Sequence, residues 1–422
     1  MNKIYDEFFD ETYYKEKLEN GLEVIIFHKP DFLTTACAFG TSYGALNIKQ
    51  LFKGKEYSFN PGIAHFLEHK LFESEEKDIF ATFSNMGCNV NAFTSYGETV
   101  YYFTTTSTNI EEPLNLLLDF VLSLDITDKT VEKEKGIIIQ ELSMYMQNPD
   151  SRLLQEAYRS MYEKYPLKYD IGGDDKTVTA ITKDELELCY KLNYHPSNMA
   201  MVIASPLDPN ELIKIVRKNQ KSKPFVLEDI PKTIIEEEKE EVFRKEYSFK
   251  MDINKPKHVY AIKLKPDFNN KQDMVKKEWC LNIYLKAYFS PINPQYQKWL
   301  DDNIINNYFG YEVDFSDNYA YVLFYSESNQ DNLKKLVDET LKEDLFNEEK
   351  LTQIKRHYIG SSFEDFDDIE NFDLGFIRDY LNGTDFFENI KTLINISSND
   401  VLSVYKGFKY DNYALIHIYP QL

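Results

Sequence analysis

The pentapeptide His65-Phe66-Leu67-Glu68-His69 constrains this 422-residue chain more than any other part of its sequence. Residues four apart lie on one face of an α-helix, so a helix through this segment turns the imidazoles of His65 and His69 toward a single ion. Glu68 then lies within reach of a water on that ion without being a ligand itself. The spacing predicts a metal site on a helix, with a carboxylate placed for general-base chemistry.

A second predicted helix, over residues 128–147, offers further carboxylates. Glu134 and Glu141 are seven residues apart, which is two helical turns, so both lie on one face. Glu141 is flanked by the isoleucines 137–139 and by Leu142, so we expect it near the buried side, where a carboxylate is costly unless it is paired or binds metal. Glu134 stands between two lysines, and the pattern leaves open whether it is a solvated charge or part of the site. Two histidines and one glutamate are the ligand set of a catalytic zinc with an open fourth position.

With these residues the sequence resembles the pitrilysin family of inverted-motif zinc metallopeptidases. The resemblance is to the branch that contains the processing peptidases, and most closely to zinc peptidases of about this length from Gram-positive bacteria. It is strongest over residues 61–148 and 194–199 and fades in the C-terminal half. It implies the LuxS/processing-peptidase-like metalloprotease fold.

The resemblance also implies roles for individual residues. The implied ligands of one Zn²⁺ per chain are His65, His69 and Glu141. Glu68 is the implied general base that activates a zinc-bound water. Glu134 is an implied catalytic residue, a carboxylate that supports the ligands without binding the ion itself.

Substrate-binding residues follow from the same resemblance. Residues 89–94 match the family's substrate-binding edge strand, and the positions expected to contact a peptide are Asn91, Ala92 and Thr94. Relatives usually carry an Arg and a Tyr in the C-terminal half that grip the substrate carbonyl. The matching stretch here, 299–311, contains no Arg. Tyr308 or Tyr311 is expected to supply the hydroxyl, and the source of the cation stays open.

The order of predicted elements repeats along the chain. The first half reads as strands near 22–28, 33–40, 88–94, 98–106 and 199–204, with helices near 62–73, 77–86, 110–124, 128–147, 150–164, 183–193 and 209–219. The second half reads as strands near 258–264, 309–316, 319–327 and 412–419, with helices near 274–289 and 294–305, three further helices, and a last helix near 398–407. We therefore expect an α+β chain of two similar α/β-sandwich halves in tandem, each a mostly antiparallel sheet covered by helices.

The expected domain boundaries lie at the Pro-containing and charged stretch after the first half. Residues 1–225 form the predicted zinc-binding catalytic half, 226–245 a linker, and 246–422 a metal-free half that helps to close a substrate chamber. The acidic run 236–241 is expected to be solvated linker or helix surface. The segment answering to the motif helix, 274–284, has no histidine, so only the first half can hold this metal site.

Composition limits the possible partners. A net charge of −22 argues against nucleic acid, and it suits either solubility alone or cationic peptides. No stretch approaches the roughly 18 apolar residues of a membrane span and none resembles a signal peptide, so we expect a cytoplasmic protein without membrane contact. The four cysteines form no C-x-x-C pair and are expected to be buried thiols. Ordinary surface or core roles are expected for the remaining histidines, which are His28, His195, His258, His357 and His417.

Together these features imply a zinc metalloendopeptidase that hydrolyses short or unfolded peptides, including leader or signal-like segments, inside an enclosed chamber. In the resembling family four halves enclose the substrate, so a chain with two is expected to form a homodimer or a heterodimer with a paralogous chain. Two alternatives stay open. The chain could be a catalytically silent or weakly active partner subunit, or a peptide-binding scaffold in complex with a paralogue.

Overall fold

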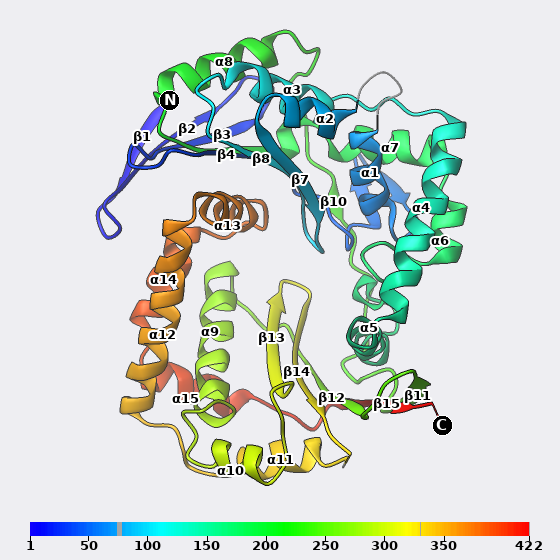
Figure 1. Cartoon of the computed structure of the whole chain (residues 1–422), viewed down its shortest axis with the longest axis vertical. Coiled ribbons are helices and arrows are strands. Elements are labelled where there is room, and N and C mark those ends of the chain that lie inside the picture. Colours follow the sequence, from blue (N-terminus) through cyan, green and yellow to red (C-terminus); the bar gives the residue numbers. More distant parts are fainter. Residues whose placement is uncertain (74–77, 330, 422) are drawn as a thin grey trace. The chain divides into compact units, whose positions relative to one another are not determined.

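A computed structural model describes residues 1–73, 78–329 and 331–421 (Figure 1). Contacts within the chain divide it into two compact units. The first unit consists of Met1–Leu142, Asp170–Ile234 and Glu364–Phe386, and the second of Ser143–Tyr169, Ile235–Phe363 and Phe387–Leu422. Each unit therefore includes one segment from the other half of the sequence, and the linear boundaries at 225 and 246 stay a prediction.

A seven-stranded sheet forms the core of the first unit, in the order β1-β2-β3-β9-β4-β8-β7. The strands are β1 (Asn2–Asp6), β2 (Glu11–Lys17), β3 (Glu23–His28), β4 (Thr35–Thr41), β7 (Cys88–Thr94), β8 (Thr99–Thr105) and β9 (Met199–Ser205). Neighbouring strands run antiparallel, apart from the parallel pair β3 and β9. A separate small sheet joins β5 (Lys49–Phe52), β6 (Lys55–Ser58) and β10 (Lys232–Thr233).

The two faces of this sheet are filled differently. Large side chains such as Phe39 and Met201 join the core under the helices α1 (Ile63–Phe72), α3 (Glu111–Val121) and α8 (Pro209–Lys221). The opposite side of β4 and β9 is formed by small residues, among them Ala38, Gly40 and Ala204, and helix α13 (Ile369–Leu381) packs there. The fit is tight, because a Cβ on Gly40 would lie 2.7 Å from a methyl carbon of Leu381. Further helices of this unit are α2 (Ile79–Asn85), α4 (Asp128–Gln147), α6 (Asp175–Ala180) and α7 (Lys183–Asn193).

The second unit contains a five-stranded sheet in the order β11-β15-β12-β14-β13. Its strands are β11 (Glu246–Met251), β12 (Lys257–Leu264), β13 (Gly310–Ser316), β14 (Tyr319–Glu327) and β15 (Tyr413–Pro420). Among the described strands of this sheet only β11 and β15 pair in parallel, so the directions repeat those of β3-β9-β4-β8-β7 in the first unit. This shared order confirms the predicted fold class of two similar, mostly antiparallel halves covered by helices.

Helices cover this second sheet as well. Helix α5 (Pro149–Met161) packs against β11, β12 and β15. Helix α9 (Lys271–Tyr288) packs against β13, and α11 (Leu333–Thr340) packs against β12 and β14. The others are α10 (Tyr296–Asp301), α12 (Glu348–Asp367), α14 (Phe386–Asn395) and α15 (Ser398–Gly407). The prediction of three helices between the fourth strand and the last helix is wrong, because the described residues contain four there. Asp368 caps a new helix start with its side chain, accepting from two backbone amides, and so separates α12 from α13.

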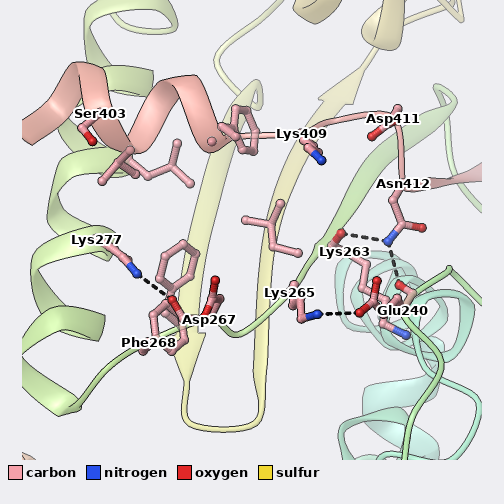
Figure 2. Close-up of a pocket in the computed structure, with 16 residues that line it drawn as sticks. Glu240, Lys263, Lys265, Asp267, Phe268, Lys277, Ser403, Lys409, Asp411 and Asn412 are labelled. Carbon is pink, nitrogen blue, oxygen red and sulfur yellow. Dashed lines mark hydrogen bonds and ion pairs between the residues drawn. The ribbon is translucent and has the colours of Figure 1, made fainter.

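A cavity of about 520 Å³ lies in the second unit (Figure 2). Its apolar lining includes Phe268 and Phe408, and lysines lie among the lining residues. Lys265 pairs with Glu240 at 2.7 Å, and Lys277 donates to the carbonyl of Asp267 at 2.6 Å. None of the predicted site residues is among the residues that line this cavity, so it does not belong to the predicted metal site.

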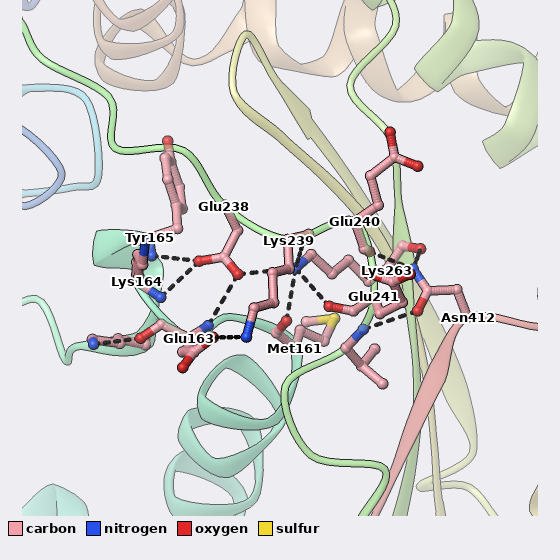
Figure 3. Close-up of polar contacts among 12 residues, drawn as sticks. Met161, Glu163, Lys164, Tyr165, Glu238, Lys239, Glu240, Glu241, Lys263 and Asn412 are labelled. Atoms are coloured by element: carbon pink, nitrogen blue, oxygen red, sulfur yellow. Dashed lines mark hydrogen bonds and ion pairs between the residues drawn. The ribbon is translucent and has the colours of Figure 1, made fainter.

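One residue of the acidic run 236–241, Glu238, is hydrogen-bonded to the segment that follows α5 (Figure 3). The Glu238 carboxylate accepts the backbone N–H groups of residues 163–165 at 2.7–3.2 Å, just after the end of α5. Lys263 lies 3.4 Å away and also donates to the carbonyls of Met161 and Lys239. Burial alone would raise the pKa of Glu238, but these amide hydrogen bonds and the lysine outweigh it and lower the pKa below its usual value. The expectation of solvated linker or helix surface therefore does not hold for the side chain of Glu238, which is 14% exposed.

The cysteines, the helix lengths and His195 can each be described from the structure. All four cysteines are buried and make no disulfide in the described structure. Helices long and apolar enough to cross a membrane are absent from the described residues. His195 precedes a short 3-10 turn that leads into β9, as the sequence predicts, and its ring accepts a hydrogen bond from the Ser197 amide.

Candidate metal centre

The motif helix α1 begins at a tight contact with another loop. Gly62, which precedes the helix, has φ of 93°, and a Cβ there would lie 2.4 Å from the carbonyl oxygen of Gly172. A Cβ on Gly172 would in turn lie 3.3 Å from Nδ1 of His65 and 2.8 Å from Leu142. Glycine at both positions lets the loop pack directly against the first predicted ligand. Sequence reasoning missed this loop, although the pair Gly172-Gly173 was a usable signal.

The structure brings the three predicted ligands together. Nε2 of His65 lies 3.8 Å and Nε2 of His69 lies 3.4 Å from Oε2 of Glu141. One donor atom from each residue lies within 4.8 Å of the others. Tetrahedral zinc with ligands at about 2.0–2.1 Å holds its donor atoms about 3.3 Å apart. Two imidazole nitrogens and one carboxylate oxygen at these distances fit zinc and leave a fourth position open.

Glu141 comes from α4, whose surroundings differ from the prediction at one point. Ile138 and Leu142 are buried as expected, but Ile137 is 44% exposed. The carboxylate of Glu141 is itself partly accessible. It therefore lies at the border between core and solvent, where a substrate or a water can reach a bound ion.

Glu134 is not a solvated charge. The residue is 6% exposed, and its Oε1 lies 3.0 Å from Nδ1 of His69. Burial would lower the pKa of His69, but the hydrogen bonds to Glu134 and Glu141 outweigh it and raise the pKa to about 9. Nδ1–H of His69 therefore donates to Glu134, which leaves Nε2 directed at Glu141 and the site.

The two histidines have opposite electrostatic environments. Burial, together with the charge of His69, lowers the pKa of His65 to about 4 despite the nearby Glu141. His65 is therefore neutral at pH 7 and has a lone pair to offer. Its Nδ1 is buried and has no hydrogen-bond partner among the described residues, consistent with the close approach of Gly172.

Glu68 is held beside the ligands by Thr94. The Thr94 hydroxyl donates to Oε2 of Glu68 at 2.5 Å. Burial raises the pKa of Glu68, although the hydrogen bonds from Thr94 and the neighbouring His69 oppose the shift. A carboxylate with a raised pKa is a better proton acceptor in chemistry near neutral pH.

The predicted substrate-binding residues fall in two places. Asn91, Ala92 and Thr94 lie on β7, which is an edge strand of its sheet and contacts α1. Oδ1 of Asn91 accepts the Ala92 amide at 2.9 Å. Tyr308 and Tyr311 belong to the second unit, where their hydroxyls donate to Asp150 and to the carbonyl of Asn282. The substrate roles of all five stay predictions.

Comparisons with known proteins identify the family of this chain. Residues 55–175 match the Insulinase (Peptidase family M16) domain, and residues 180–356 match the Peptidase M16 inactive domain. The metal-binding motif falls within the first match. Glu141 does so too, so every predicted ligand lies in the first matched domain and none in the one described as inactive.

Two of the similar proteins match over nearly the whole chain, and a third matches over about half of it. An uncharacterized zinc protease of Bacillus subtilis (strain 168), YmfH, is 36% identical over 96% of this chain and 95% of its own length. A solved M16-like peptidase structure from Alicyclobacillus acidocaldarius has a TM-score of 0.91 and 29% identity over 97% of this chain and 99% of its own. A probable mitochondrial-processing peptidase subunit beta of Schizosaccharomyces pombe is 28% identical over 48% of this chain and 43% of its own length. This chain belongs to peptidase family M16, the insulinase family of zinc proteases.

Proposed function

We propose that the chain is a zinc-dependent endopeptidase that hydrolyses short or unfolded peptides, including leader or signal-like segments. The observation that carries the proposal is the convergence of His65, His69 and Glu141 beside a partly buried carboxylate, Glu68, that is no part of the ligand set. The name of the Bacillus relative, a zinc protease, supports the same class of reaction.

Each residue has a distinct task in this mechanism. Bound zinc would polarise the scissile carbonyl and lower the pKa of a water. Glu68 takes a proton from the attacking water and delivers it to the leaving amine, and the Thr94 hydroxyl fixes the orientation of its carboxylate. Glu134 accepts the Nδ1–H of His69 and so keeps Nε2 of that ring free to bind the ion.

The substrate is proposed to bind as an added strand along β7. An edge strand offers unpaired backbone groups to an extended peptide. At Ala92 the amide is covered only by the neighbouring side chain of Asn91, which is exposed and can rotate away to admit a peptide carbonyl. Backbone hydrogen bonds then supply affinity, and specificity stays loose.

We also propose that one chain is not the complete enzyme. The chain supplies two halves, only one of which carries the motif, and an enclosed chamber of four halves needs a second chain. A homodimer would provide it, and a heterodimer with a paralogue would also bring a substrate-gripping cation that residues 299–311 lack. Light scattering combined with activity measured over a range of protein concentrations tests this. Full specific activity from a strictly monomeric species contradicts the chamber.

The function is tested by separating metal binding from chemistry. Glu68→Gln preserves shape but cannot accept the proton, so the variant should keep about one zinc per chain and lose turnover of a peptide library read by mass spectrometry. His65→Ala and Glu141→Ala should lose much of the zinc affinity. Glu132→Gln, on the exposed side of α4, is the matched control and should change neither.

Two outcomes would contradict the proposal. Cleavage by Glu68→Gln at the parental rate would show that Glu68 is not the base. Stoichiometric zinc in the parent protein with no cleavage of any peptide, alone or with a co-expressed paralogue, would show that the chain is not a peptidase.

A further inference from the structure

An arginine of helix α13 lies over the edge strand along which the peptide is proposed to bind. The guanidinium carbon of Arg378 is 5.5 Å from the ring centroid of Phe93, which lies on β7. Both residues belong to the first unit, although they are far apart in the sequence and no local pattern connects them. The fold therefore places a cation beside β7, outside the stretch 299–311 in which the family resemblance predicts one.

The side chain of Phe93 points to the side of the sheet that α13 covers. Phe93 pairs directly with Val100 of β8, so the two side chains share one face. A Cβ on Gly40 would meet methyl groups of both Val100 and Leu381 of α13, at 2.9 and 2.7 Å. Val100, and with it Phe93, therefore faces α13. The next residue, Thr94, points to the opposite side, where the motif helix lies.

Two hydrogen bonds hold the end of α13 against the turn between β7 and β8. Nε of Arg378 donates to one carboxylate oxygen of Glu98 at 3.2 Å, and the side-chain amide of Asn382 donates to the other at 2.9 Å. Glu98 is 2% exposed, so its charge needs these partners. Gly97 leaves room for Asn382, because a Cβ there would lie 2.4 Å from the side-chain oxygen of Asn382. The guanidinium is therefore held beside β7 before any peptide binds.

Most donors of this guanidinium are unused. Arginine offers N–H groups on Nε and on both Nη atoms. Within the part of the chain that the structure describes, only the Nε–H of Arg378 has an acceptor. The side chain is 55% exposed, so a ligand can reach it. The two Nη groups form a planar fork that matches the two oxygens of a carboxylate.

A peptide strand added to β7 would place every second side chain on the α13 side of the sheet. Side chains that face each other across two strands have Cβ atoms about 4.5–5.5 Å apart. The peptide side chain opposite Phe93 therefore stands beside the ring over which Arg378 lies. We propose that Arg378 is a specificity-determining residue that binds the carboxylate of an Asp or Glu side chain at this position of the substrate. This inference rests on the proposed function, because it takes the peptide to bind along β7.

The position lies close to the bond that is cut. Thr94, the residue after Phe93, donates to Glu68, the proposed base. Residues along a strand are about 3.3 Å apart, so the side chain beside Phe93 belongs to a peptide residue within about two positions of the scissile bond. The preferred acid should appear at one fixed position in that range. It should not be preferred at the two adjacent positions, whose side chains point to the other side of the sheet.

The expected preference is modest. Glu98 already balances the charge of Arg378, so a bound carboxylate gains hydrogen bonds at contact rather than the attraction of a free cation. The net charge of −22 repels an acidic peptide at long range, but salt screens exposed charges beyond about 8 Å. We expect Glu at this position to be favoured about fivefold over Gln, the upper end for an exposed ion pair.

The first test measures cleavage. Cleavage sites in a peptide library are mapped by mass spectrometry for the zinc-loaded parent and for Arg378→Gln, whose amide can still donate to Glu98. The parent should prefer Asp or Glu about fivefold at the fixed position, and the variant should lose this preference. Arg217→Gln is the matched control, since this arginine of α8 pairs with Glu16 and is 41% exposed. The control should leave the preference unchanged. Circular dichroism verifies that both variants are folded.

The second test measures binding without turnover. Fluorescence anisotropy with zinc-loaded Glu68→Gln compares labelled peptides in which a single Glu or Gln moves along an otherwise identical extended sequence. At one position Glu should bind about fivefold more tightly than Gln, and adding Arg378→Gln should remove the difference. This binding preference without cleavage by the parent would refute the peptidase function and leave the role of Arg378 standing. Cleavage without an acidic preference at any fixed position, an unchanged preference in Arg378→Gln, or no binding of any peptide would overturn the role of Arg378.

Discussion

Glu134 provides the sharpest test of how the proposed metal centre is organised, because the sequence leaves its surroundings open and the structure places it beside His69. Its carboxylate is 6% exposed and lies 3.0 Å from Nδ1 of His69. Glu134→Gln keeps an acceptor of similar shape and removes the charge, whereas Glu134→Ala leaves the buried Nδ1–H of His69 without a partner. An unpaired buried donor costs about 1–3 kcal/mol.

The expected loss follows from these numbers. Outer partners of metal-binding histidines typically contribute 10–100-fold to metal affinity or activity, which is about 1.4–2.7 kcal/mol. We therefore expect Glu134→Gln to weaken zinc binding and kcat/KM by about tenfold, and Glu134→Ala by up to about a hundredfold. Neither variant should lose zinc altogether, because the three proposed ligands are retained.

The assay is competition for zinc against a chromophoric chelator at fixed pH, with peptide cleavage measured on the same samples. Glu132→Gln is the control, since this glutamate is two residues away on the same helix and its side chain is 69% exposed. Circular dichroism verifies that each variant is folded. Affinity and kcat/KM within twofold of the parent for folded Glu134→Ala would refute the role assigned to this hydrogen bond.

Three further predictions concern the surroundings of the site and the fold. Gly172→Ala places a methyl group 2.8 Å from Leu142 and 3.3 Å from Nδ1 of His65. The variant should therefore be destabilised by about 1–3 kcal/mol and should bind zinc more weakly. An unchanged melting temperature and zinc affinity would contradict the close packing of this loop against His65. Asp373 is 1% exposed, and burial raises its pKa well above the usual value despite a hydrogen bond from the Ala204 amide. Because the pKa is higher in the folded state, the parent protein is destabilised as the pH rises above the unfolded-state pKa of Asp373. Asp373→Asn cannot ionise, so its melting temperature should rise relative to that of the parent between pH 4 and 8. A pH-independent difference between the two melting temperatures would count against this prediction. Zinc at a thousand times its Kd stabilises a folded protein by about 4 kcal/mol, so chelation should lower the melting temperature reversibly, and no shift on adding zinc back would argue against a preformed site.

Local patterns explain what the sequence predicts correctly. The motif helix, the helix that carries Glu141, and the edge strand β7 each follow from residues within one element, and the structure places them within a few residues of the prediction. The strands β1 and β2 were missed, because their half-exposed residues mix charges with aromatic side chains and give a weak alternation.

Contacts between distant segments explain what the sequence could not show. The partner of Glu134 is 65 residues away, and the approach of Gly172 to His65 joins a loop to the motif helix, which no periodicity connects. The pairing of His258 with His417 depends on strand register, which is set only when the sheet forms. Such features need a three-dimensional arrangement rather than a local pattern.

The placement of α13 has a consequence for synthesis of the chain. The helix that covers the small-residue side of the first sheet is encoded by residues 369–381, long after the last strand of that sheet at residues 199–205. Translation therefore yields a complete sheet with one apolar side uncovered until the ribosome has passed Leu381. We therefore expect nascent chains in this interval to need chaperones, and an early stop codon to leave an aggregation-prone product even when every predicted zinc ligand has been made. For the same reason we expect the part of the gene that encodes the predicted catalytic half not to fold as an independent unit.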